Sequence, residues 1–154
     1  MENNTGQSRW FLLRWNPEIS SYTLDRYRAD RRKFHNNFYG NWSVWDWRNA
    51  DKGDRYVMMR VDNANPGIVW HGEFVSAPYE EESWRGDGKT IHYCDMSFLD
   101  CTAPTRKPLI KLEQLTEDMP EIDWMHGHSG EVIPEATAQK LEKLLDASLG
   151  IYID

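Results

Sequence analysis

Three tryptophans, Trp42, Trp45 and Trp47, lie close together in a polar stretch that continues into Arg48 and Asn49. Indole rings stack on planar bases, at about 1–3 kcal/mol per base, and they can also enclose a methyl or ammonium group. Asparagine side chains offer a donor and an acceptor for the edge of a base. Because tryptophan is hard to bury completely, we predict that at least one ring lines a pocket. The sequence leaves open the alternative that these rings pack against a helix over 21–34.

Other reactive residue types give weaker signals. Ser129 lies in the Gly-His-Ser-Gly segment at 127–130, which lacks the spacing of a nucleophile elbow. The residues that could bind a metal ion through an imidazole or a thiol are His35, His71, His92, Cys94, Cys101, His126 and His128. Their spacing contains no CxxC, HxxxH or HExxH motif, and only His92 and Cys94 are expected to share a strand face. Phosphate-binding glycine motifs are absent. The sequence therefore assigns no catalytic residue, metal or cofactor.

Charge is distributed unevenly along the chain, whose net charge is −7. Residues 9–60 hold 11 Lys and Arg against 6 Asp and Glu, whereas residues 61–154 hold 7 against 18. Such asymmetry allows one basic face on an acidic protein. The basic side of the helix predicted over 21–34 is either solvated or in contact with phosphates; its members are Arg26, Arg28, Arg32 and Lys33.

The chain has 154 residues, which favours one domain over 9–154 after a disordered lead-in at 1–8. Hydrophobic patterns predict strands at 10–15, 54–61, 68–76 and 90–99 and a short one at 109–112. Helices are predicted from Ser20 or Ser21 to about 34 and from Pro134 to Gly150. Loops are predicted at 35–53 and 78–88, and irregular structure that could include one helical turn at 113–124. This pattern indicates an α+β fold of four to six mostly antiparallel strands, a small barrel with flanking helices.

Two further features suggest the compartment. No apolar run approaches the ~18 residues of a membrane span, and residues 1–8 lack the apolar core of a secretory signal. Two cysteines cannot form a disulfide framework. We expect a cytoplasmic protein in which Cys94 and Cys101 are free thiols.

The order of motifs resembles that of the EVE domain, a PUA-like domain related to the YTH and SRA base readers. The similar segments are 10–17 (WFLLRWNP), 45–49 (WDWRN), 53–57 (GDRYV), 66–70 (PGIVW) and 75–79 (VSAPY). Residues 124–133 are similar to a segment of EVE-like modules in modification-dependent restriction systems. The chain departs from the family pattern in three places: Arg14-Trp15-Asn16 replaces Lys-Ser-Glu, one residue is missing before Arg48, and Trp70 replaces a glycine.

The resemblance implies a mixed, mostly antiparallel PUA-like barrel whose pocket receives a flipped-out base, methylated or hydroxymethylated, of DNA or RNA. The implied ligand-binding residues are Arg14, Asn16, Trp42, Trp45, Trp47, Asn49 and Ser129, and Arg26, Arg28, Arg32 and Lys33 would contact the nucleic-acid backbone. The partner would be a nucleic acid with a modified base, and a partner nuclease would fit the restriction systems.

Two alternatives remain open at this point. The net negative charge favours a domain for small molecules or proteins on the same barrel, since phosphate neutralisation normally drives nucleic-acid affinity. The third reading is an enzyme acting on nucleotides or RNA, with Ser129, His126 or His128 beside a carboxylate.

Overall fold

Eight strands form one mixed sheet in the computed structural model, which describes residues 8–34 and 39–153. The strands are β1 (Trp10–Trp15), β2 (Tyr39–Ser43), β3 (Arg55–Arg60), β4 (Gly67–Phe74), β5 (Tyr79–Glu82), β6 (Thr90–Thr102), β7 (Ile110–Lys111) and β8 (Glu131–Ile133). The helices are α1 (Leu24–Phe34), α2 (Leu112–Asp118) and α3 (Glu135–Ile153), with a 3-10 turn, η1 (Trp47–Asn49).

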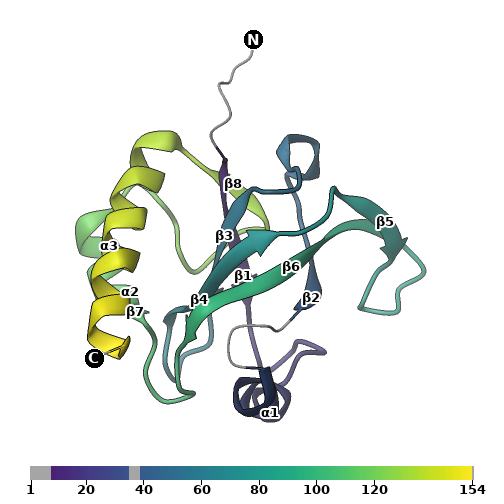
Figure 1. The fold of residues 1–154 in the computed structure, drawn as a ribbon. Coiled ribbons are helices and arrows are strands. Elements are labelled where there is room, and N and C mark those ends of the chain that lie inside the picture. Colours follow the sequence, from purple (N-terminus) through teal and green to yellow (C-terminus); the bar gives the residue numbers. More distant parts are fainter. Residues whose placement is uncertain (1–7, 35–38, 154) are drawn as a thin grey trace.

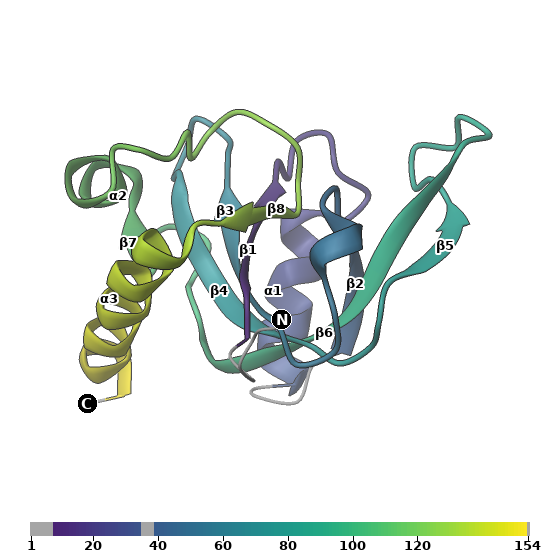
Figure 2. The same ribbon diagram turned by 90° about the horizontal axis from the view of Figure 1, so that it is seen from above.

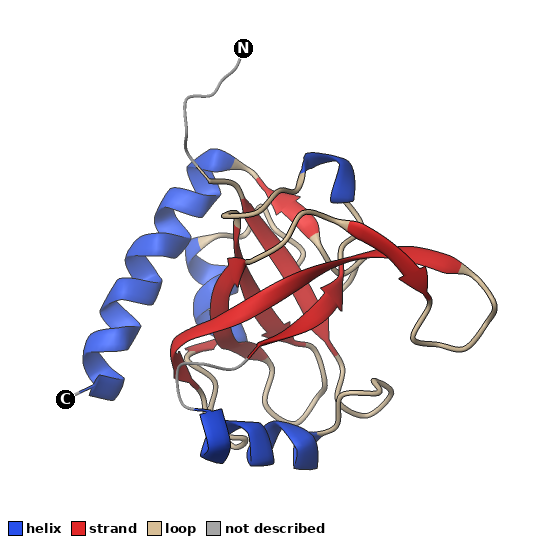
Figure 3. Cartoon of the chain, turned by 45° about the vertical axis from the view of Figure 1, so that its right-hand side comes forward, coloured by secondary structure: helices blue, strands red, loops and turns tan. Residues whose placement is uncertain are grey.

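The sheet follows the order β2-β6-β4-β3-β1-β8, while β5 pairs with β6 and β7 pairs with β4. Only β1 and β3 run parallel; the other pairs of described strands are antiparallel. The strands curve into a half-barrel, with α2 and α3 together on one side of it and α1 at its other end (Figures 1 and 2). In Figure 3, which is coloured by secondary structure, the helices lie around the outside of the curved sheet. The expected α+β, mostly antiparallel architecture is confirmed.

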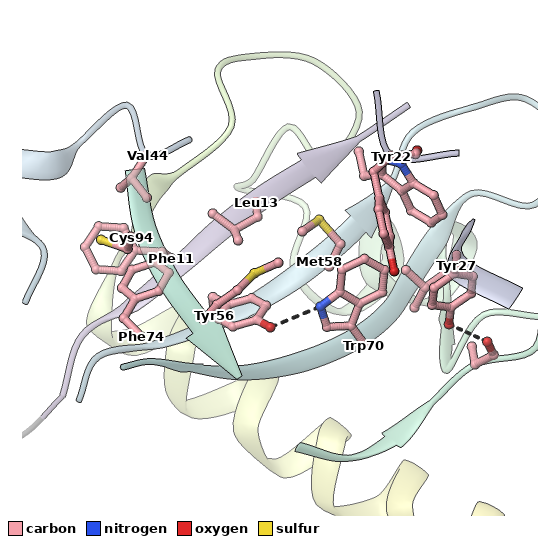
Figure 4. Close-up of a cluster of buried hydrophobic side chains, with 14 residues drawn as sticks. Phe11, Leu13, Tyr22, Tyr27, Val44, Tyr56, Met58, Trp70, Phe74 and Cys94 are labelled. Atoms are coloured by element: carbon pink, nitrogen blue, oxygen red, sulfur yellow. Dashed lines mark hydrogen bonds between the residues drawn. The ribbon is translucent and has the colours of Figure 1, made fainter. Parts of the chain in front are cut away.

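Side chains of β1 alternate between two hydrophobic cores, because successive strand residues point to opposite faces. Phe11, Leu13 and Trp15 enter the inner core with aromatic residues of α1 and β4. Trp10 and Leu12 enter the outer core, which α2 and α3 cover. Figure 4 shows the inner core, where Trp70 Nε1–H donates to Tyr56 Oη at 3.1 Å. Both faces of β1 are buried, which explains why its sequence is apolar except at Arg14.

The two ends of the strand order meet just after β2 and just before β8. Trp45 N–H donates to Ser129 O at 2.9 Å, and Asp46 N–H donates to Gly130 O at 3.0 Å. Gly130 has φ +93°, and a Cβ there would lie 2.5 Å from Val44 Cα. Only glycine therefore permits this close approach. It joins two segments that are far apart in the sequence.

Several predicted elements need correction. Residues 35–53 are not all loop, because they contain β2 and η1, and the acidic loop 78–88 contains β5. Residues 112–118 form α2, which begins one residue earlier and is longer than the single helical turn allowed for 113–124, and β8 was not predicted. The strand count is eight instead of four to six. β2 and β5 are short and polar, and β8 has only three residues, so that pairing with β6 or β1, rather than their own pattern, makes them strands.

Gly150 does not end the last helix, which runs to residue 153. One glycine inside a helix costs only about 1 kcal/mol, which neighbouring residues can offset. No helix in the described part of the chain combines the length and the apolar character that a membrane crossing requires.

The first helix begins at Leu24, later than predicted, and Thr23 caps it in place of Ser20 or Ser21. Arg26 N–H donates to Thr23 Oγ1 at 3.2 Å, and Tyr27 N–H donates to Thr23 O at 3.0 Å. We expect Thr23→Ala to lower the free energy of unfolding by about 1 kcal/mol, since it removes this cap. Chemical denaturation measures the change. Thr23→Ser, which keeps the hydroxyl, should cost much less; equal losses in both variants would contradict the capping role.

Candidate functional site

A groove of about 1020 Å³ lies where the half-barrel closes. Its walls come from the end of β1 and the residues after it, from β2 and η1, from the β5–β6 hairpin, and from the loop before β8. All seven residues expected to bind a ligand line this groove: Arg14, Asn16, Trp42, Trp45, Trp47, Asn49 and Ser129. The side chain of Arg14 differs from the others in that it is turned into the protein. The closure thus brings together residues from opposite ends of the sequence.

Trp42 is the most firmly positioned ring of the groove. Its half-buried indole donates Nε1–H to Ser129 Oγ at 3.1 Å. It meets Tyr22 edge to face, with ring centroids 6.0 Å apart, and Trp70 in the same way at 6.4 Å. Edge-to-face pairs of this kind are favourable for aromatic rings. Trp42 therefore combines anchored packing against the inner core with a position on the wall of the groove.

Trp45 and Trp47 each stack on a histidine from another part of the chain. The Trp45 and His128 rings lie 3.6 Å apart at 5°, and the Trp47 and His92 rings lie 3.6 Å apart at 8°. Trp45 nevertheless keeps 59% of its surface exposed, whereas Trp47 is half-buried. The three indoles thus differ: Trp42 is packed on one side, Trp47 is covered, and Trp45 offers an open surface at the rim.

Ser129 and Asn16 each bring to the groove a hydrogen-bond donor that has no acceptor among the described residues. Ser129 Oγ accepts from Arg14 N–H at 2.8 Å and from Trp42 Nε1–H, which leaves the hydroxyl hydrogen available. Asn16 Oδ1 accepts from Glu18 N–H at 3.0 Å, which orients the amide and leaves its NH₂ group available. A planar ligand with acceptors along one edge would complement both groups.

Arg14 holds the wall of the groove from inside. Its side chain is 6% exposed and pairs with Glu131 at 2.6 Å. The guanidinium also donates to the carbonyls of Asp123, Trp124 and His128. Through these bonds, Arg14 fixes the loop that carries Ser129 against the end of β1. Asn49, another of the residues expected to bind a ligand, is exposed in η1, where its carbonyl accepts from Arg9 Nη1 at 2.6 Å.

Three arginines of the groove lie against aromatic rings. The guanidinium carbons of Arg26, Arg48 and Arg85 lie 5.7 Å, 4.4 Å and 4.6 Å from the centroids of Tyr22, Trp47 and Trp84. None of the three forms an ion pair with any residue the structure describes. The one carboxylate among the described lining residues, that of Asp46, accepts from Val132 N–H at 2.8 Å. The groove is thus locally cationic in an acidic protein.

Of the basic residues expected to contact phosphates, the three whose side chains the structure describes do not all reach the groove. Arg26 lines the groove, whereas Arg28 and Arg32 do not. Arg28 pairs with Asp25 at 2.9 Å, and Arg32 is exposed elsewhere on α1. The side chain of Lys33 lies outside the described residues.

The residues considered for catalysis or metal binding do not form a reactive set. No described imidazole bonds to Ser129: His128 stacks on Trp45, and His126 Nδ1 lies 3.3 Å from Asp123. No three His, Cys, Asp or Glu side chains in the described part of the chain converge on one point. Burial raises the pKa of the free Cys94 thiol to about 12, so it is protonated at neutral pH. His35 and the side chain of Cys101 lie outside the described residues.

Among the further groove residues, Tyr22, Trp84 and Arg85 were not anticipated as site residues, and His92 and His128 were considered only for metal binding or catalysis. Burial, followed by the bond that Tyr22 donates to Asp30 at 2.6 Å, raises the pKa of Tyr22, so its ring stays neutral. The adjacent Trp84 and Arg85 repeat the Trp47-Arg48 pair, and this repetition was the available sequence signal. The histidine stacks had no such signal, because they depend on tertiary contacts.

Structural comparison places this architecture among known folds. The chain is similar to a hypothetical protein from Leishmania major, with a TM-score of 0.65, 12% sequence identity and coverage of 93% of this chain and 98% of that one. A protein from Pseudomonas putida matches with a TM-score of 0.58 and 16% identity over 88% of this chain and 99% of that one. The YTH domain protein Mmi1, in a complex with RNA, matches with a TM-score of 0.58 and 12% identity over 96% and 87%.

These similarities show that the chain has a PUA-like fold, which it shares with YTH domains. The expectation drawn from the sequence motifs is therefore confirmed at the level of the fold. No family model matches the sequence, and no curated protein is significantly similar to it.

Proposed function

Starting from the fold shared with an RNA-bound YTH domain, we propose that this protein binds nucleic acid and accepts one flipped-out, modified base in its groove. Trp42 forms the wall on which the base stacks, and Trp45 supplies a second aromatic surface at the rim. The free hydroxyl hydrogen of Ser129 and the free NH₂ of Asn16 donate to the edge of the base. Asn49, which also lines the groove, adds a further polar contact to the ligand.

The observation that carries this proposal is the combination of an anchored indole with unpaired cations in one groove. A flipped base loses its stacking neighbours at a cost of a few kcal/mol, and stacking on an aromatic side chain offsets that cost. A methyl group on the base adds apolar contact with the indole. Arg26 and Arg48 can then neutralise the phosphates on either side of the flipped nucleotide.

The positive charge of the groove makes nucleic-acid binding compatible with the net negative charge of the protein. Phosphate contacts depend on the charges near the binding surface, because a Debye length is only about 8 Å at physiological ionic strength. Carboxylates elsewhere on the protein are therefore screened from a ligand in the groove. Three arginines without an ion pair at one site favour a negatively charged ligand over a neutral small molecule.

The direct experiment is binding of single-stranded DNA and RNA nonamers that each carry one methylated or hydroxymethylated base, measured at low salt. We expect at least one modified strand to bind more tightly than its unmodified counterpart, because the indole wall rewards added apolar surface. Equal affinity for every modified strand and its counterpart would remove base reading. Failure of all strands to bind would remove the function itself.

Arg26 and Arg32 provide a matched test of the backbone contact, since both are exposed on α1 and only Arg26 lines the groove. We expect Arg26→Gln to weaken oligonucleotide binding and to reduce the slope of log affinity against log salt by about 1, the value for one lost phosphate contact. Arg32→Gln should change neither quantity. Equal effects of both substitutions would show that the nucleic acid does not follow the groove.

A further inference from the structure

The hairpin between β5 and β6 extends the groove beyond the proposed base site. Its tip carries Trp84 and Arg85, which line the same groove as Trp42 and Trp47. Figure 2 shows β5 and this tip projecting away from the half-barrel. Trp84 is 38% exposed, and the Arg85 guanidinium carbon lies 4.6 Å from its ring centroid. Neither side chain has a role in the single-base site.

The tip is an ordered structure that fixes where Trp84 stands. Ser83 N–H donates to Lys89 O at 2.8 Å, and Gly86 N–H donates to Ser83 O at 3.1 Å. Arg85 N–H donates to the buried Ser83 hydroxyl at 3.2 Å. At the base of the tip, Tyr93 Oη donates to Glu82 O at 2.9 Å. Because the backbone of the tip is already ordered, presenting Trp84 to a ligand costs little backbone entropy on binding.

The size of the groove points to more than one bound nucleotide. Its volume of about 1020 Å³ lies at the upper limit of sites for whole small molecules, which span roughly 300–1,000 Å³. One base against Trp42 leaves the part beside the hairpin unfilled. We propose that Trp84, backed by Arg85, is a second stacking platform that takes the base of a nucleotide next to the flipped one. This inference rests on the proposed function and extends it to a second subsite.

Charge around the tip determines how the platform acts. Glu82 and Asp87 flank Trp84 in the sequence and are exposed, so they oppose the approach of phosphates. Glu80 lies 3.8 Å from His92, on the same hairpin. The phosphates therefore follow Arg26 and Arg48, and the tip contributes stacking on a ring whose face is open to any base. The platform should consequently tolerate many sequences and contribute little to the salt dependence.

The test compares two ligands that carry the same modified base: the nonamer that binds best and the corresponding mononucleotide. Because one base–aromatic stack is worth about 5- to 150-fold in affinity, we expect Trp84→Ala to weaken nonamer binding within that range. Binding of the mononucleotide should stay unchanged, and so should the salt slope of the nonamer. Trp84→Phe keeps an aromatic face and should restore most of the lost affinity.

Three outcomes separate this inference from the proposed function. If Trp84→Ala weakens the nonamer and the mononucleotide equally, the ring belongs to the single-base site and there is no second platform. If it weakens neither while wild type binds both, the hairpin does not contact the ligand. If wild type binds no modified ligand at all, the proposed function itself has failed. Thermal unfolding of each variant confirms that the comparison is made between folded proteins.

Discussion

Replacing Trp42 by alanine should weaken binding of the modified nonamer by about 5- to 150-fold, the value of one base–aromatic stack. Trp42 is the ring that the structure positions most firmly, through its bond to Ser129 Oγ and its edge contacts with Tyr22 and Trp70. Removing it also takes away the apolar surface that distinguishes a methylated base. We therefore expect the preference for the modified strand over its unmodified counterpart to fall together with the affinity. Titration of both strands measures the two effects.

The control for this prediction is Trp42→Phe, which keeps a ring in the wall and loses the Nε1–H donor to Ser129. It should retain part of the affinity, whereas the alanine variant should not. Since Trp42 packs against the inner core, the alanine variant will also be less stable, and its binding must be measured where it is fully folded. A folded alanine variant that still discriminates between the two strands would contradict the role of Trp42.

Arg14→Met should lower the free energy of unfolding by about 3–5 kcal/mol, the cost of breaking a buried charge network by removing one partner. The guanidinium bonds to Glu131 and to three carbonyls of the loop that precedes β8. Methionine fills similar space and offers no donor, so these acceptors lose their partners. The loop also carries Ser129 and closes the half-barrel, so ligand affinity should fall as well. Urea denaturation measures the loss of stability.

Glu131→Gln serves as the comparison for this effect. The carboxylate of Glu131 is partly exposed and its removal leaves the carbonyl bonds of Arg14 in place, so that the loss should stay near 1 kcal/mol or below. The groove should then keep its affinity. A loss for Arg14→Met no greater than that for Glu131→Gln would show that Arg14 does not hold the loop.

The main strands could be predicted because their apolar patterns are strong. β1, β3 and β4 were all expected close to their observed bounds, since each is buried on both faces or nearly so. β2 and β5 were not, because a polar sequence such as YGNWS or YEEE becomes a strand only through its pairing with β6. Tertiary pairing overrides local propensity at these edges.

The candidate site was predicted as a set of residues but not as a geometry. Asn16, Trp42 and Ser129 were all proposed from the sequence, and the structure places them on one groove. The sequence could not show that His128 covers Trp45 or that His92 covers Trp47, because each stack joins segments brought together by folding. The inward position of Arg14 likewise depends on acceptors from residues 123–131.

The central claim is that a planar base occupies the space beside Trp42, and a nitrogen–proton correlation NMR spectrum of the tryptophan indoles tests it most directly. The modified mononucleotide of the best-binding strand is titrated into the protein, and the Trp42 indole signal is assigned through Trp42→Phe. We predict a saturable shift of the Trp42 signal, while the signals of Trp10 and Trp124, in the outer core, stay in place. Saturable binding that leaves the Trp42 signal unmoved would contradict the account.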